Sequence, residues 1–246
     1  MKNQFLTIIG SFILAQLVIN KGIGQNHPDF SARFSYGADL HLSDLKARYG
    51  NGLSAGIGVQ WLKKNGLAYT AEWNILFGSK VSDNSIKDFA QSNGSFIGTD
   101  GLESLVYGRY RGESMGFLIS KILSKQAMKG FMVGFGSGII THRTKYIDDT
   151  RSFNQIYYND GKIFDRKTRG IYLRQVLGYE LHSRDGLING VIQLEATQGL
   201  TKFVRKNQNA APANVDDLLN DFSIGLKAVW FLPLVKTPIK DEIKYF

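Results

Sequence analysis

The chain has 246 residues, a formal net charge of +9, 27 glycines, four prolines and no cysteine. The lack of cysteine excludes disulfides, thiol chemistry and an acylated cysteine anchor. No low-complexity linker or block of like charge divides the sequence, so its length and composition predict one domain after a leader.

The N-terminus has the features of an export signal. Lys2 precedes an apolar run over residues 5–19, which is shorter than the roughly 20 residues of a membrane-spanning helix. Gly22 and Gly24 follow as the small residues of a signal-peptidase site. We therefore expect residues 1–24 to be cleaved and residues 25–246 to form the mature domain, with a retained anchor as the alternative.

The basic charge constrains the partners. Loss of Lys2 and Lys21 with the leader lowers the net charge from +9 to +7. An exported basic chain meets anionic head groups and lipopolysaccharide phosphates, so outer-membrane lipid and lipopolysaccharide are predicted partners, and nucleic acid is not. Because the basic residues are scattered along the sequence, no dedicated basic face is expected.

Eight segments alternate apolar and polar residues, which is the pattern of a half-buried strand. In the first, Phe30 and Phe34 belong to the apolar phase and Arg33 to the polar phase. The predicted strands cover residues 30–40, 53–61, 67–77, 115–124, 131–139, 171–182, 188–200 and 222–232. The segment at 115–124 is the weakest, because Lys121 falls in the apolar phase.

The connections between these strands alternate in length. Residues 42–51, 78–114, 144–167 and 201–220 are long connections, and residues 63–66, 125–129 and 183–186 are short ones. A soluble sandwich gives no reason for this order, whereas a membrane barrel has short periplasmic turns and long extracellular loops. The sequence therefore predicts an eight-stranded antiparallel transmembrane β-barrel, integral to the outer membrane. Residues 233–246 would form a short periplasmic tail.

The polar phase of the strands is expected to face the lumen. Its main members are Arg33, Asp39, His41, Gln60, Glu72, Asn74, Arg174, Glu180, His182, Gln193, Glu195 and Lys227. Eight strands leave room for side chains but not for an aqueous channel, and buried charges need partners. We expect ion pairs and hydrogen bonds to plug the barrel; a narrow pore is the alternative.

The loop at residues 144–167 is the candidate site of partner contact. It combines aromatic residues with arginine, and both residue types anchor protein contacts. The residues expected to touch a partner are Tyr146, Phe153, Tyr157, Tyr158, Phe164 and Arg166. The alternative is that this loop folds onto itself as a lid over the barrel.

One constellation could carry catalysis. His142 with Asp148 and Asp149 could activate water or a serine at the extracellular rim. No nucleophile motif accompanies it, and the carboxylates lack the spacing of a calcium loop. We predict no catalytic residue, no metal site and no cofactor; a rim enzyme that modifies lipid A or peptides is the alternative.

Several short motifs, spread over roughly half of the mature chain, carry a family resemblance. They are Gly134-Phe135-Gly136-Ser137-Gly138, Tyr158 to Gly161, Phe164-Asp165-Arg166, Gly178-Tyr179, Gln198-Gly199-Leu200-Thr201, Trp230-Phe231-Leu232-Pro233 and Lys244-Tyr245-Phe246. On these motifs the sequence resembles small outer-membrane β-barrel proteins of Bacteroidota, although residues 161–166 depart from the group's Lys-Gly-Tyr-Asp-Arg pattern.

The resemblance implies an accessory of the type IX secretion and gliding machinery, with other envelope or secretion proteins as partners. The resemblance assigns no catalytic residue to this sequence. Together with the predicted plug, it leads to a non-enzymatic outer-membrane barrel that acts as an anchor or accessory subunit of a cell-envelope complex.

Overall fold

The computed structural model describes residues 30–63, 65–82, 85–123, 129–154, 156–157, 164–182, 189–204 and 217–235. The predicted signal segment, the short connection at 183–186, nearly all of that at 125–129 and tail residues 236–246 lie outside the described residues.

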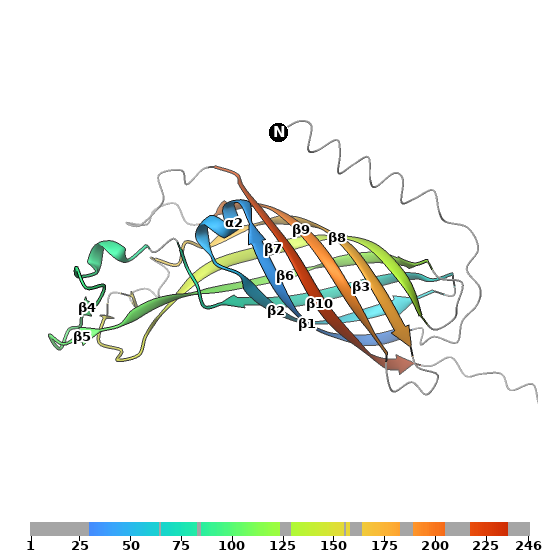
Figure 1. Ribbon diagram of the computed structural model, residues 1–246, viewed down its shortest axis with the longest axis horizontal. Helices are drawn as coiled ribbons and strands as arrows, with labels where there is room; N and C mark the ends of the chain where they lie inside the picture. The colour runs from blue at the N-terminus through green and yellow to red at the C-terminus, as the bar shows by residue number, and fades with distance from the viewer. Residues whose placement is uncertain are drawn as a thin grey trace, which may run out of the picture.

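Eight long strands form a closed barrel in the part of the chain that the structure describes. They are β1 (Phe30–Leu42), β2 (Gly52–Leu62), β3 (Leu67–Gly78), β6 (Val106–Ile122), β7 (Lys129–Asp148), β8 (Thr168–His182), β9 (Asn189–Phe203) and β10 (Leu219–Val235). Every pair is antiparallel, and β1 closes the ring by pairing with β10 (Figure 1). The predicted eight-stranded antiparallel barrel is confirmed.

Short elements occupy the long connections. A six-residue helix, α2 (Ser43–Arg48), follows β1, and the connection from β3 to β6 contains the 3-10 turn η1 (Lys87–Phe89) and the strands β4 (Phe96–Ile97) and β5 (Glu103–Ser104). These elements lie at one end of the barrel (Figure 1), which the loop lengths identify as extracellular. No helix among the described residues is long and apolar enough to cross a membrane.

Strands β6 and β7 are longer than the sequence predicted. The predicted segments began at residue 115 and ended at residue 139, whereas β6 begins at Val106 and β7 continues to Asp148. Beyond the membrane most outward positions of both strands are polar or charged, with Ile147 as an apolar exception, so apolar alternation ends while backbone pairing continues. Tyr146 is therefore a strand residue, not a loop residue. The last strand was also predicted too short, since Pro233 pairs with Ser31 inside the sheet.

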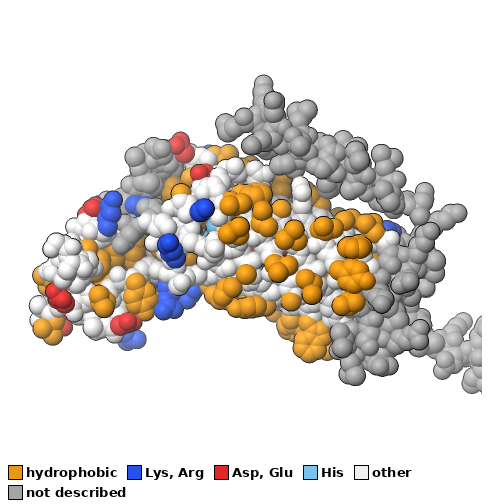
Figure 2. Space-filling model, viewed as in Figure 1, with side chains coloured by type: hydrophobic (Ala, Val, Ile, Leu, Met, Phe, Trp, Pro, Cys, Tyr) orange, Lys and Arg blue, Asp and Glu red, His pale blue; other side chains and the backbone are white. Residues whose placement is uncertain are grey.

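The outward face of the barrel is apolar. Hydrophobic side chains cover the visible face of the barrel in Figure 2, whereas charged side chains gather toward the extracellular end. Near the periplasmic end, Trp61 and Tyr69 lie with ring centroids 5.8 Å apart, and the ammonium of Lys63 lies about 5 Å from both rings. This arrangement is typical of a lipid-facing belt with interfacial aromatic residues.

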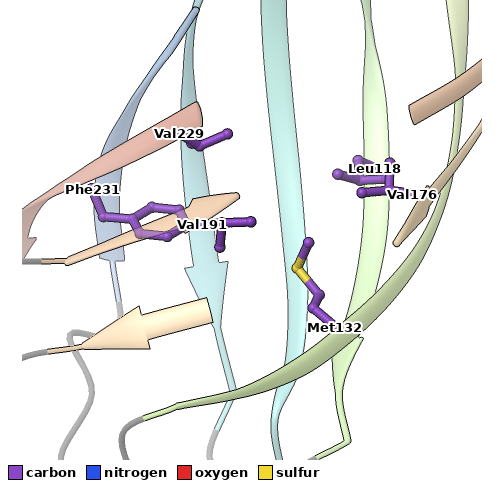
Figure 3. Packing of buried hydrophobic residues seen from close by; sticks show 6 residues of the cluster. All are labelled: Leu118, Met132, Val176, Val191, Val229 and Phe231. Atoms are coloured by element: carbon purple, nitrogen blue, oxygen red, sulfur yellow. The ribbon is translucent and has the colours of Figure 1, made fainter. Parts of the chain in front are cut away.

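The periplasmic half of the lumen is filled by apolar side chains. One buried cluster consists of Leu118, Met132, Val176, Val191, Val229 and Phe231 (Figure 3). These residues belong to the inward phase, which the sequence assigned to polar groups alone. The prediction of a plugged lumen is right, but its periplasmic half is closed by ordinary apolar packing.

Above this cluster lies a layer of paired charges. Arg174 contacts Glu72, and its Nε lies 3.5 Å from Glu195 Oε2. Lys227 Nζ lies 2.9 Å from the same Glu195 oxygen, and Gln193 donates a hydrogen bond of 2.6 Å to Oε1. Two carboxylates thus neutralise two buried cations, as burial of charge requires.

Arg33 joins the apolar and charged layers. Its guanidinium donates to Thr70 Oγ1 at 2.8 Å and to Gln60 Oε1 at 3.2 Å. The same group lies 5.4 Å from the centroid of the Phe231 ring. Arg33 therefore joins the two layers into one continuous plug among the described residues of the lumen.

Candidate functional site

The upper lumen is closed by the segment that follows β1. In α2, Leu45 and Arg48 are buried, and Arg48 contacts Asp221 of β10. Arg48 also donates to Thr168 Oγ1 at 3.2 Å, and Thr201 donates to Asp221 Oδ2 at 2.7 Å. A buried ion pair and a hydrogen bond thus fix this lid to β10 and β8, and Thr201 of β9 supports the Asp221 carboxylate.

His142 of β7 is buried in the upper lumen and does not lie at an open rim. Its side chain is 1% exposed. Its Nδ1 shares a hydrogen bond of 2.8 Å with the Tyr110 hydroxyl, and its Nε2 lies 3.6 Å from Asp221 Oδ2. The structure does not bring Asp148 or Asp149 to His142; the nearby carboxylate is Asp221, which sequence spacing gave no means of finding.

Beside His142 lies a polar cavity of about 30 Å³. Its lining includes Asp39, His41 and Arg174. A cavity of this size holds one or two waters and no substrate. Within the described residues, no group of three or more histidine, aspartate and glutamate side chains could hold a metal ion.

Asp148 organises the extracellular loops above the barrel. Its Oδ1 accepts hydrogen bonds from Ser104 Oγ at 2.6 Å and from the Thr150 backbone N–H at 3.0 Å, and its Oδ2 accepts from the Phe153 N–H at 2.8 Å. Asp148 stands on β7 well beyond Ile139, the last apolar outward residue before the charged rim. Partial burial raises the pKa of this carboxyl, but these hydrogen bonds outweigh it and lower the pKa to about 2.

The two longest loops share a hydrophobic core. It consists of Ile86, Phe96, Phe153, Ile156 and Phe164, with Tyr146 packed against it. Ser85 links the loops, because its N–H donates to the Tyr146 hydroxyl at 2.9 Å and its Oγ donates to the Phe164 carbonyl at 2.7 Å. We call the unit formed by the described residues 79–82, 85–105, 149–154, 156–157 and 164–167 the cap.

The predicted contact residues are divided by this core. Phe153 and Phe164 are buried in it, so they stabilise the cap and do not reach a partner. Tyr157 is exposed and its hydroxyl donates to the Asp148 carbonyl at 3.3 Å, and Arg166 is half-buried at a φ of 41°. Tyr158 lies outside the described residues. Both phenylalanines pack against Ile86 and Phe96 of the other long loop.

The exposed apolar residues of the cap lie mostly in the other loop. Leu102 is 68% exposed and Leu105 is 70% exposed, and Ile97 also faces solvent. Ile97 and Leu102 belong to the β4–β5 hairpin, in which the Gly98 N–H donates to the Leu102 carbonyl at 2.9 Å, and Leu105 directly follows the hairpin. Ile97, Leu102 and Leu105 form what we call the apolar tip. The sequence pattern that predicts a contact site at residues 144–167 does not extend to the apolar tip, although Ile97 beside Gly98 and Leu102 beside Gly101 stand in a long loop.

Comparison with known proteins supports the fold. No protein family matches the sequence, and no curated protein matches it. Among solved structures, Neisserial surface protein A (NspA) superposes with a TM-score of 0.51 at 13% identity, over 83% of this chain and 97% of that one. Ail of Yersinia pestis gives a TM-score of 0.41 at 12% identity, over 82% of this chain and 97% of that one.

The barrel, its apolar belt and its charged plug define a class: the chain is an integral outer-membrane β-barrel protein. Within that class, its structural neighbours are small barrels, including the N-terminal domain of OprF of Pseudomonas aeruginosa (TM-score 0.36, 8% identity, 85% of this chain and 99% of that one). Identities this low carry the fold and nothing finer, so the resemblance to Bacteroidota barrels stays a prediction.

Proposed function

We propose that this protein is a non-enzymatic outer-membrane anchor or accessory subunit whose cap binds another envelope protein through the apolar tip. The observation that carries the proposal is the exposure of Leu102, in the β4–β5 hairpin, and of Leu105, directly after it. Apolar side chains gathered in water mark interaction sites, and the bilayer cannot cover these two because they lie beyond the charged rim.

The cap supports this role because it is a fixed platform. Ser104 of the hairpin is tied to Asp148, and Phe96 packs against Phe153 with ring centroids 5.1 Å apart. A pre-ordered tip loses little conformational entropy on binding, which favours affinity. The plugged barrel below it then serves as the membrane anchor.

The two alternative functions each meet a physical objection. A rim enzyme would need His142 to reach substrate, but His142 is buried and already bonded to Tyr110. A pore would need a path past Arg174, Glu195 and Lys227, whose mutual pairing fills the lumen. The partner class that the sequence resemblance implies is the type IX secretion and gliding machinery.

The test is affinity purification of the tagged full chain from membranes in mild detergent. We expect wild type to retain a stoichiometric envelope protein and the variant Leu102→Asp with Leu105→Asp to lose it. The matched control, Ser79→Asp with Asn154→Asp, adds the same charge at exposed positions of the cap outside the hairpin and should retain the partner. A wild-type barrel that purifies alone, or equal loss in both variants, would contradict the proposal.

A further inference from the structure

Basic side chains gather on one side of the barrel, just above its apolar belt. Seven cations make up the group. Arg109, Arg111, Arg143, Lys145, Arg169 and Lys202 are outward-facing residues of β6, β7, β8 and β9, and Lys167 directly precedes β8. We call this set the basic rim. It corrects the expectation of scattered charge, because strand register brings together cations that are far apart in sequence.

The register places like charges directly opposite one another. Arg111 pairs with Arg143 across β6 and β7, and Arg169 pairs with Lys202 across β8 and β9. Arg109 and Lys145 form a third such pair. Like charges opposite each other on one face destabilise a sheet, so the fold alone gives no reason for three of them.

Carboxylates do not neutralise the basic rim. Within the described part of the chain, none of its seven members forms an ion pair. Glu113 is the acidic residue of the same outward surface, and it stands opposite Thr141. Arg109 stacks on Tyr107, with its guanidinium 5.1 Å from the ring centroid. The excess positive charge is therefore open to an external anion.

The height of the basic rim matches the head groups of the outer leaflet. Arg169 is the outward residue next to Ile171 on β8, and Lys202 is the outward residue next to Leu200 on β9. Both apolar neighbours belong to the membrane-facing belt. Cations at this boundary meet the anionic groups of lipids that stand beside the barrel.

A pocket of about 510 Å³ spans the same boundary. Ile75 and Phe77 of β3 line its apolar part, and Arg111, Arg143 and Lys167 line its basic part. Glu113 lines the pocket as well, so three cations face one carboxylate there. An apolar wall joined to a basic wall suits a molecule with acyl chains and phosphates. The outward positions at the extracellular ends of the other described strands, β10, β1, β2 and β3, carry no lysine or arginine, so the site is confined to one side.

We propose that the basic rim binds the phosphates of a phosphorylated glycolipid of the outer leaflet, lipopolysaccharide, whose acyl chains lie against Ile75 and Phe77. The pocket centred on Arg111 and Arg143 is the main site, and Arg169 with Lys202 extends it around the barrel. This inference concerns lipid and holds whether or not the apolar tip binds a protein.

The experiment measures binding to the purified full chain in a non-ionic detergent by native mass spectrometry and by fluorescence titration. The probes are lipopolysaccharide, its dephosphorylated form, phosphatidylglycerol and inorganic phosphate. We expect lipopolysaccharide to bind best and to bind more weakly as salt rises. The variant Arg111→Gln with Arg143→Gln should bind about 30-fold more weakly.

The matched control is Lys46→Gln with Lys80→Gln, which removes two exposed cations from the same end but outside the basic rim; its affinity should equal that of wild type. If both variants bound lipopolysaccharide equally weakly, the loss of affinity would follow from net charge alone, and the proposed site would be wrong. Equal binding of the dephosphorylated form, or of phosphatidylglycerol or inorganic phosphate alone, would overturn the assignment to a phosphorylated glycolipid.

Discussion

Strand β8 carries an arginine on each face, and their surroundings differ. Arg174 faces the lumen, is buried, and contacts Glu72 and Glu195. Arg169 faces outward, is exposed, and stands opposite Lys202. A buried cation must be paired because its desolvation costs several kcal/mol, whereas water and salt screen an exposed one. The lumenal charges therefore hold the barrel together, and the rim charges are available to a ligand.

The sharpest test of the lumenal side is Glu195→Ala. Arg174 and Lys227 would lose a shared carboxylate, and we expect the free energy of unfolding to fall by about 3–5 kcal/mol. Urea unfolding of the chain in lipid vesicles measures it. Glu195→Leu combined with Lys227→Met removes both charges and should restore most of the loss; a single variant as stable as wild type would show that the lumenal pairs do not hold the barrel.

The ion pair between Arg48 and Asp221 in the lid should also stabilise the structure, at a position closer to solvent. Asp221→Asn removes the charge that holds Arg48, so we expect the segment around α2 to loosen by about 2 kcal/mol. Trypsin should then cleave after Lys46 or Arg48 faster than in wild type. The control is Asp44→Asn, which alters a half-buried carboxylate that accepts from the Asn220 N–H at 2.7 Å and should change the cleavage rate much less. Equal cleavage rates in the two variants would contradict the prediction that Asp221 holds the lid more strongly than Asp44 does.

Asp148 extends the comparison to pH. Its pKa of about 2 in the folded cap lies below the ordinary value of 3.8, so its stabilising effect is complete above about pH 4 and is lost as the pH falls through 2. The gain at neutral pH is about 1–2 kcal/mol after allowance for screening near the surface. Hydrogen exchange of residues 149–154, corrected for intrinsic rates, should rise at low pH in wild type and at pH 7 in Asp148→Asn. A pH-independent rate in wild type would count against this role.

The smallest effect is expected on the rim. In lipid-free detergent, Arg111→Gln with Arg143→Gln should change the free energy of unfolding by less than about 1 kcal/mol, with a slight gain because a like-charge pair is removed. The same urea titration measures it. If the free energy of unfolding fell as much as in Glu195→Ala, the rim cations would stabilise the fold, and the inward and outward charges would not differ in role.

Much of the architecture follows from local pattern. The period-2 alternation located all eight barrel strands and assigned Arg33, Arg174 and Glu195 to the lumen. It failed at Val106 and at Asp148, because strands that continue above the bilayer no longer need apolar outward residues. The apolar inward cluster around Phe231 was missed for a related reason: alternation separates the two faces only where one of them is polar.

The candidate site was harder to predict. Aromatic residues in a long loop were expected to face a partner, but Phe153 and Phe164 pack against Ile86 and Phe96 from the other loop. Without that second loop beside them, buried and exposed aromatic residues have the same sequence signature. Leu102 and Leu105 are exposed, but single leucines in loops are common, so the sequence does not distinguish them from buried ones.

The sequence by itself determined which face of each strand a side chain occupies, since that depends only on the two-residue period of the backbone. Tertiary structure alone decided which side chains meet. Strand register set Arg111 opposite Arg143 and brought Asp221 to both Arg48 and His142, because ring closure joins residues that no local spacing relates. The two-residue alternation therefore shows which charges face inward and which face outward. Only the closed barrel shows that the inward charges are paired and the rim charges are not.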